Sequence, residues 1–194
     1  MLVTDDALLG GRDPVAVARA AERGGVTAVQ LRLKRATARE LAEIARALVA
    51  ALRVPVLVND RPDVAIAAGA AGVHLGPDDL PVALARRIAP PGFIVGASVG
   101  TPEEAAGAAG ADYWGVGPWR ATSTKPDAGA ALGPEGFRRT VALAKGTPCV
   151  AIGGVRPEDV PAVLAAGGAG VAVAAGILGA ADVERAARSY RGEA

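Results

Sequence analysis

The chain has 194 residues, of which 51% are hydrophobic and 21% charged, and its formal net charge is +1. This composition can bury a substantial core, which excludes an intrinsically disordered chain. The near-neutral charge and the lack of any run of five basic residues argue against nucleic-acid binding, and no apolar run approaches the length of a membrane span.

The beginning of the chain and its cysteine indicate a compartment. Asp5 and Asp6 interrupt the first apolar residues, so the sequence shows no signal peptide and we expect a soluble, cytoplasmic protein. The single cysteine, Cys149, cannot form an intrachain disulfide and stands in an apolar run, which indicates a small core residue rather than a nucleophile. The sequence leaves the oligomeric state open, and a homo-oligomer is compatible with it.

Short apolar runs alternate with helical patterns along the chain. The runs predict strands at Leu2–Thr4, Ala28–Arg32, Val56–Val58, Gly72–Leu75, Ile94–Ser98, Tyr113–Gly115, Cys149–Ile152 and Gly170–Ala174. These strands are almost continuously apolar, which is typical of parallel strands covered on both faces. Several of them follow a glycine at the end of a helical pattern, where a left-handed residue suits the helix terminus.

The helical patterns between the strands have recognisable starts. Asp13 precedes a proline, and Thr37–Glu40 and Thr101–Glu104 match the capping box. Further helices are predicted at Thr37–Leu52, Pro62–Ala68, Pro81–Ile88, Gly136–Lys145, Pro157–Ala166 and Ala180–Tyr190. Eight strands alternating with eight helices predict a compact (β/α)₈ TIM barrel that forms one domain over residues 1–194. An open doubly wound sheet is the alternative, but no Gly-x-Gly-x-x-Gly follows the first strand.

In a barrel of this class the active site lies at the carboxyl ends of the strands, so residues at those ends are the candidates. The second strand ends in Gln30-Leu-Arg-Leu-Lys34. Gln30, Arg32 and Lys34 alternate along the strand and therefore project to one side, while Leu31 and Leu33 project to the other. Two cations on one side of a strand end favour a polyanionic ligand over a merely solvated surface.

Carboxylates follow the next two strands. Asp60 comes after Asn59 at the end of the third strand, and Asp79 follows the fourth strand. Carboxylates at adjacent strand ends can share Mg²⁺, which typically takes one or two of them and completes its coordination with water and substrate phosphate. Each aspartate also precedes a helical segment, so each alone is better interpreted as a helix cap. Together, beside the cations, they favour the metal site.

Two further polar residues end central strands. His74 is the only histidine. It could serve as a general base near neutral pH, but a hydrogen-bonded structural role is the more common one for a histidine beside an apolar run. Ser98 ends the fifth strand, and since no Ser-His-Asp arrangement can be assigned, we interpret it as a hydrogen-bond donor and not a nucleophile.

A second anion site is predicted on the other side of the barrel. Gly115–Lys125 opens with two glycines and a proline and then presents Thr122, Ser123, Thr124 and Lys125, which suit a phosphate or diphosphate although they do not form a Walker A loop. The last two strands end in Gly153-Gly154 and Ala174–Gly176. Loops after these two strands commonly bind phosphate through backbone N–H groups.

These residues occur as short motifs in a fixed order. The motifs are Gln30–Lys34, Asn59–Arg61, Val73–Gly76 with Asp79, Gly96–Ser98, Gly115–Pro118, Thr122–Lys125 and Ala151–Gly154. Together they cover most of the chain and resemble the thiamine-phosphate synthase (thiamine-phosphate pyrophosphorylase) family. The Thr-x-Thr-Lys and Asn-Asp-Arg motifs are the most specific of the set.

The resemblance implies a barrel enzyme that joins 4-amino-2-methyl-5-(diphosphooxymethyl)pyrimidine to 4-methyl-5-(2-phosphooxyethyl)thiazole, or its carboxylated form, giving thiamine phosphate and diphosphate. It implies that Gln30, Leu31, Arg32, Leu33, Lys34, Asn59, Ser98 and Lys125 hold the pyrimidine diphosphate. It assigns Mg²⁺ to Asp60 and Asp79, and the thiazole phosphate to Thr122, Ser123, Thr124, Gly154, Ala174 and Ala175. Arg32, Lys34, Lys125 and Ser98 would stabilise the leaving diphosphate.

The sequence departs from the family pattern at two positions and leaves other functions open. Pro77 stands where a glutamine is usual, and Ala175 where a serine is common near the second phosphate, so a hydroxyl contact there is lost. A thiazole tautomerase using His74, a silent phosphate-binding barrel and another phosphate-dependent isomerase are the alternatives. The length and composition of the loop Gly117–Leu132 predict a lid over the substrate.

Overall fold

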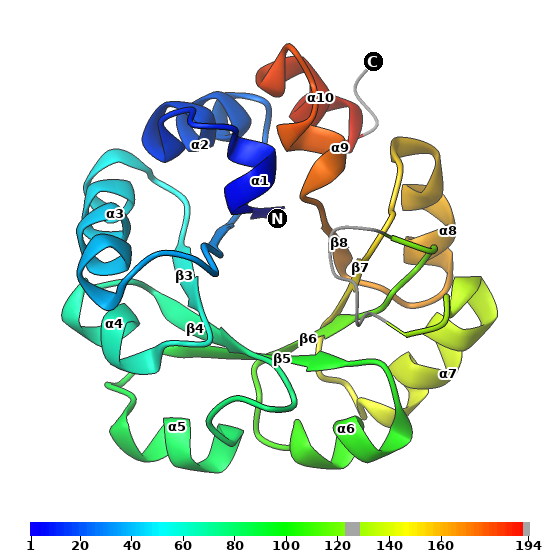
Figure 1. Cartoon of the computed structure of the whole chain (residues 1–194). Coiled ribbons are helices and arrows are strands. Elements are labelled where there is room, and N and C mark those ends of the chain that lie inside the picture. Colours follow the sequence, from blue (N-terminus) through cyan, green and yellow to red (C-terminus); the bar gives the residue numbers. More distant parts are fainter. Residues whose placement is uncertain (123–128, 192–194) are drawn as a thin grey trace.

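The computed structural model describes residues 1–122 and 129–191, and it shows eight parallel strands surrounded by helices (Figure 1). The strands are β1 (Leu2–Val3), β2 (Val29–Leu31), β3 (Val56–Asn59), β4 (Gly72–Leu75), β5 (Ile94–Val99), β6 (Tyr113–Val116), β7 (Cys149–Ile152) and β8 (Gly170–Ala172). Each pairs in parallel with the next in the chain. A parallel bridge between Leu2 and Val173 joins β8 back to β1, so the sheet closes into a (β/α)₈ barrel.

Helices follow the strands and form the outer layer (Figure 1). They are α1 (Asp6–Leu9), α2 (Pro14–Arg23), α3 (Ala38–Ala51), α4 (Pro62–Ala67), α5 (Val82–Ile88), α6 (Pro102–Gly107), α7 (Gly133–Leu143), the 3₁₀ turn η1 (Pro157–Asp159), α8 (Val160–Ala165), α9 (Ala175–Leu178) and α10 (Val183–Ser189). In the described part of the chain no helix is long and apolar enough to cross a membrane.

The helix starts are those that the sequence predicts. The carboxylate of Asp13 accepts hydrogen bonds from the backbone N–H groups of Val15 and Ala16 at the start of α2. Thr37 and Thr101 each complete a capping box at α3 and α6. These side chains satisfy N–H groups that have no partner within the helix. Local sequence therefore fixes where three of the helices begin.

The apolar core lies between the strands and the helices. Leu31, Val58, Val73 and Val95 come from four strands and are fully buried, and Phe137 of α7 packs in the same layer. Because side chains alternate across a strand, the neighbours of these residues point into the barrel. Cys149 also belongs to this core, as predicted, and burial raises the pKa of its thiol to about 11.

All eight predicted strands are confirmed, with ends that shift by one or two residues. The short helices α1 and α9 were not predicted. Each has four residues, which is little more than one turn, so no apolar periodicity can identify it. Both follow strands that meet at the closure of the barrel, β1 and β8, and they lie at the end where the strands terminate.

Candidate active site

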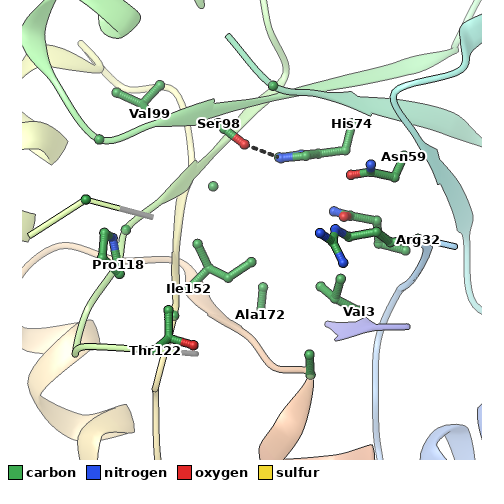
Figure 2. A pocket seen from close by; sticks show the side chains of 18 of the residues that line it. Val3, Arg32, Asn59, His74, Ser98, Val99, Pro118, Thr122, Ile152 and Ala172 are labelled. Carbon is green, nitrogen blue, oxygen red and sulfur yellow. Dashed lines mark hydrogen bonds between the residues drawn. The ribbon is translucent and has the colours of Figure 1, made fainter. Parts of the chain in front are cut away.

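A cavity of about 580 Å³ opens at the carboxyl ends of the strands. Figure 2 shows Arg32, Asn59 and His74 on one side of this cavity, and Thr122 and Ile152 across from them. The predicted site residues that line it are Gln30, Arg32, Lys34, Asn59, Asp60, Asp79, Ser98, Thr122, Gly154, Ala174 and Ala175. The fold thus brings together residues that are up to 145 positions apart, from Gln30 to Ala175.

Five predicted residues are not placed at the cavity. Leu31 is fully buried in the apolar core, and Leu33 packs against that core, because both alternate with the residues that face inward. The structure does not bring their side chains to the cavity. Ser123, Thr124 and Lys125 lie outside the described residues, so their assignments stay predictions, as does the lid over residues 117–132.

Arg32 is held in place by the segment after β1. Its backbone N–H donates to the Oγ1 of Thr4 over 2.8 Å, and its guanidinium donates to the Oδ2 of Asp5 over 2.7 Å. The other carboxylate oxygen of Asp5 accepts from the backbone of Ala7 and Leu8 at the start of α1. Asp5 therefore both caps a helix and orients the arginine. Thr4 and Asp5 were missed by sequence reasoning, although Thr4 ends a predicted strand and Asp5 directly follows it.

Lys34 and two aspartates form a charged cluster beside Arg32. The ammonium of Lys34 lies 2.5 Å from the Oδ2 of Asp60, and the side chain of Asp60 is hydrogen bonded to Asp79. Burial, followed by the neighbouring Asp60, raises the pKa of Asp79. The pKa of Asp60 is lowered: burial opposes the shift, but the hydrogen bonds from Asp79 and Lys34 outweigh it. The two carboxylates therefore lie within hydrogen-bond reach of each other.

Neither aspartate caps a helix, so that alternative is not supported. The cap positions of α4 and α5 are Arg61 and Pro81, without a side-chain hydrogen bond at either. Asp60 has a left-handed backbone (φ 64°), and Asp79 accepts a 2.7 Å hydrogen bond from the backbone N–H of Gly76. A non-glycine residue at positive φ is uncommon and indicates a functional constraint.

The carboxylate pair fits a hard divalent cation. Among residues 1–122 and 129–191, no group of three or more His, Cys, Asp or Glu is arranged to hold a metal ion. A cation between Asp60 and Asp79 would therefore draw its remaining ligands from water and phosphate oxygens, which is how Mg²⁺ is usually bound in phosphate-handling enzymes. The closeness of the two carboxylates at the cavity wall supports the fit.

His74 lies between two hydroxyl groups deep in the cavity. Its Nε2 is 3.0 Å from the Oγ of Ser98, as Figure 2 shows, and its Nδ1 is 2.8 Å from the hydroxyl of Tyr113. Tyr113 is in turn hydrogen bonded to Gln30, and burial raises the pKa of its phenol. These contacts agree with the interpretation of His74 as a hydrogen-bonded residue that orients Ser98.

Glycines make room for this hydrogen-bonded chain. A Cβ on Gly96 would lie 2.2 Å from the ring of Tyr113, and one on Gly115 would lie 3.0 Å from His74. Neither position tolerates a larger residue without displacing the ring beside it. Sequence reasoning treated Tyr113 only as part of an apolar strand; a phenol among apolar strand residues is the signal that could have identified it, since a buried hydroxyl needs a partner.

The opposite side of the cavity is built from backbone. Gly153 and Gly154 follow β7 with φ of 88° and 66°, a conformation that glycine adopts without strain. Ala174 and Ala175 follow β8 and begin α9, and both line the cavity. Small residues leave the N–H groups accessible to an anion. Thr122 adds a hydroxyl to this side.

The two departures from the family pattern both lie at the cavity. Pro77 lines it, two residues before Asp79. The hydrogen bond between Gly76 and Asp79 spans the proline, so Asp79 still reaches Asp60. Ala175 is exposed to the cavity and offers its backbone alone. The first departure therefore leaves the carboxylate pair intact, and the second removes a hydroxyl.

A closed barrel with cations, carboxylates and a glycine turn around one cavity defines an enzyme that acts on small phosphorylated substrates. Comparison with known proteins identifies the family. A family model described as thiamine monophosphate synthase matches residues 1–177. The chain is 49% identical to the thiamine-phosphate synthase of Azorhizobium caulinodans, over 98% of this chain and 92% of the relative. It is 46% identical to that of Moorella thermoacetica, over 94% and 89%.

A solved structure gives the same result. The thiamine phosphate pyrophosphorylase from Pyrococcus furiosus superposes with a TM-score of 0.87 at 40% identity, covering 98% of this chain and 93% of that one. The chain therefore belongs to the thiamine monophosphate synthase family, and it is a transferase of thiamine biosynthesis.

Proposed function

We propose that the chain condenses the diphosphate of 4-amino-5-hydroxymethyl-2-methylpyrimidine with 4-methyl-5-(2-phosphooxyethyl)thiazole, or its carboxylated form, and releases diphosphate in a Mg²⁺-dependent reaction. One observation carries the proposal. A single cavity has a cluster of two cations and two carboxylates on one side and a backbone cradle of glycines and alanines on the other. It thereby offers separate places for a diphosphate and a phosphate.

The charged side would hold the pyrimidine diphosphate. Arg32 and Lys34 lie where they can pair with its oxygens, and Asn59 and Gln30 line the wall beside them. Asp60 and Asp79 would hold Mg²⁺, which neutralises the negative charge that develops on the leaving diphosphate. Ser98, oriented by His74, can donate a hydrogen bond to the same group. Lys125 is assigned to this group by the family resemblance.

The other side would hold the thiazole phosphate. Thr122, Gly154, Ala174 and Ala175 line this side and could offer a hydroxyl and backbone N–H groups to the phosphate. Ser123 and Thr124 are assigned to the same phosphate by resemblance. With the two substrates held in this way, the thiazole nitrogen would face the pyrimidine methylene carbon.

The coupling reaction requires no nucleophilic side chain from the protein. The bond between the methylene carbon and the diphosphate oxygen breaks, and the electron-rich aminopyrimidine stabilises the resulting cation. The thiazole nitrogen then donates its electron pair to that carbon. The chain would therefore contribute leaving-group stabilisation, through Arg32, Lys34 and the carboxylate pair that could hold Mg²⁺, and alignment of two substrates.

The test is a reaction of the purified protein with both substrates, with and without Mg²⁺, in which thiamine phosphate is followed by mass. Product formed only with Mg²⁺ is the expected result. Isomerisation of the thiazole phosphate without coupling would favour a tautomerase, and the two partners of His74 argue against a free general base there. Binding of both substrates with no turnover would favour a silent barrel, and an isomerisation that is indifferent to Mg²⁺ would favour another phosphate-dependent isomerase.

A further inference from the structure

Two loops that frame the thiazole-phosphate side of the cavity are joined to each other. The segment after β6 runs beside the end of β7. The backbone N–H of Trp119 donates to the carbonyl of Ile152 over 2.8 Å, and that of Arg120 donates to the carbonyl of Gly153 over 2.9 Å. The position of one loop therefore depends on the other.

An ion pair reinforces this junction. The guanidinium of Arg120 makes two hydrogen bonds to the carboxylate of Asp159, one of them from Nε to Oδ2 over 2.9 Å. Such two-point pairs fix the orientation of both side chains. The side chain of Asp159 is 7% exposed and that of Arg120 is 47% exposed, so the carboxylate is the fixed partner and the arginine is held by it.

Asp159 is itself anchored to the turn after β7. Its Oδ2 accepts a 2.9 Å hydrogen bond from the backbone N–H of Arg156, two residues beyond Gly154. The hydrogen bond from Arg120 is the main reason that the pKa of Asp159 is lowered. The carboxylate thus ties the turn that carries Gly153 and Gly154 to the loop that carries Arg120.

The packing at this junction is close. A Cβ on Gly154 would lie 2.9 Å from the Cβ of Arg120 and 3.0 Å from the carbonyl oxygen of Ala121. Residues 120 and 121 therefore lie directly against Gly154, and Thr122, the next residue, lines the cavity. Neither Arg120 nor Asp159 lines the cavity. A small displacement of Arg120 would nevertheless change the distance between Thr122 and the N–H of Gly154.

We propose that Arg120 and Asp159 form a positioning pair that presets the thiazole-phosphate subsite. The pair holds the loop after β6 against the Gly153–Gly154 turn, so that the hydroxyl and backbone donors of the two loops are at phosphate-binding distance before the substrate arrives. This inference rests on the proposed function for the identity of the phosphate ligand. Arg120 and Asp159, which lie outside the cavity, would thus affect the affinity for the thiazole phosphate.

The loop after β6 has other anchors besides this pair, which makes the proposal testable by mutation. Trp119 is only 3% exposed and packs edge-on against Phe137, with ring centroids 5.5 Å apart. This contact and the two backbone hydrogen bonds anchor the base of the loop when the ion pair is absent. We therefore expect Arg120→Met to fold.

The experiment is a double-mutant cycle of Arg120→Met and Asp159→Asn, with KM measured for each substrate separately. The KM for the thiazole phosphate should rise about tenfold in each single variant and no further in the double variant, because either change breaks the same pair. The KM for the pyrimidine diphosphate should not change. Arg120→Lys keeps the charge without the two-point geometry and should restore only part of the affinity.

A matched control breaks a comparable ion pair elsewhere. Arg86 and Asp112 lie 2.6 Å apart at the opposite end of the barrel, so Arg86→Met should leave both KM values unchanged. An unchanged thiazole-phosphate KM in Arg120→Met, an equal rise for both substrates, or additive effects in the double variant would overturn the proposal.

A second readout separates this proposal from the proposed function. Binding of inorganic phosphate to the same variants is measured by calorimetry, which requires no turnover. If the wild-type protein makes no thiamine phosphate, the coupling reaction is rejected, yet weaker phosphate binding by Arg120→Met than by the wild type or Arg86→Met still supports the positioning pair. Equal binding by all three, or no binding by the wild type, contradicts it.

Discussion

The two sides of the cavity, each of which we propose to bind an anion, are built in different ways. On the side of β2, β3 and β4, charged side chains are already paired within the protein: Arg32 with Asp5, and Lys34 with Asp60. On the side of β7 and β8, no charge is needed at the cavity wall, because glycines in a left-handed conformation and small residues present the backbone itself.

The difference bears on how each side can be altered. Paired side chains can exchange one partner for another. When a diphosphate and a cation bind, Lys34 can pair with the diphosphate and Asp60 with the cation in place of their contact with each other. A backbone cradle has no partner to exchange, and its geometry depends on φ angles and on the loop packed against it. Mutations on the charged side should therefore affect the chemical step, and mutations on the backbone side should affect substrate affinity.

The largest effect is expected from Asp60→Asn combined with Asp79→Asn. Both oxygen pairs that could hold the cation lose their charge, so Mg²⁺-dependent turnover should fall at least about 10³-fold. Asparagine accepts a left-handed backbone, so the conformation at residue 60 is kept. Thiamine phosphate is measured by mass, and circular dichroism checks the fold. Asp63→Asn, which breaks an exposed ion pair with Arg61, is the control. Retained turnover in the double variant would contradict the assignment of the metal site to Asp60 and Asp79.

The backbone side is tested by Gly154→Ala. Position 154 has a φ of 66°, and the added Cβ would press on Arg120 and Ala121, so the KM for the thiazole phosphate should rise about 10–100-fold. Gly69→Ala provides the control, because φ there is 69° and nothing lies within 4 Å of the new Cβ. It should cost similar stability and leave both KM values alone. Equal kinetic effects of the two changes would show that strain, and not the cradle, matters.

A smaller effect is expected from Asp5→Asn on the charged side. The amide oxygen can still cap α1, but the ion pair that orients Arg32 is lost, so kcat/KM for the pyrimidine diphosphate should fall about tenfold. Asp13→Asn changes a similar cap on α2 that holds no arginine. The melting temperatures of the two variants should agree while their kinetics differ. If Asp5→Asn and Asp13→Asn have the same kinetics, Asp5 acts only as a helix cap.

The smallest effect is a pH dependence of stability. Arg120 lowers the pKa of Asp159 in the folded state. A lowered folded pKa contributes stability above the unfolded value of about 3.9, and this contribution is lost as the pH falls through the folded pKa. The melting temperature of the wild type should exceed that of Asp159→Asn by a constant amount from about pH 7 to pH 5, and the gap should shrink below about pH 4. A gap that is constant down to pH 2 would contradict this assignment.

Much of the fold and one side of the cavity could be predicted from local pattern. Apolar runs between capped helices identified all eight strands, because a strand covered on both faces leaves a continuous signal. The alternation of Gln30, Arg32 and Lys34 with Leu31 and Leu33 correctly separated the residues that line the cavity from those in the core.

The rest of the site depends on contacts between residues far apart in the sequence, which no local pattern predicts. His74 and Tyr113 are 39 residues apart, as are Arg120 and Asp159, and nothing in their neighbourhoods marks either pair. Asp60 follows a strand and precedes a helix, which fits a cap equally well, and only the structure shows that the cap position of α4 is Arg61. The short helices α1 and α9 have four residues each, which is too few for a periodic apolar signal.

The edge-on packing of Trp119 on Phe137 also gives the protein an internal optical probe. The chain has two tryptophans, and the other, Trp114, is buried in β6 with its indole N–H donating to the carbonyl of Ala108. In a Trp114→Phe variant, all tryptophan fluorescence would come from the base of the loop beside the glycine turn. Emission from that single fluorophore would report, without a label, whether the base of the loop shifts when a substrate binds.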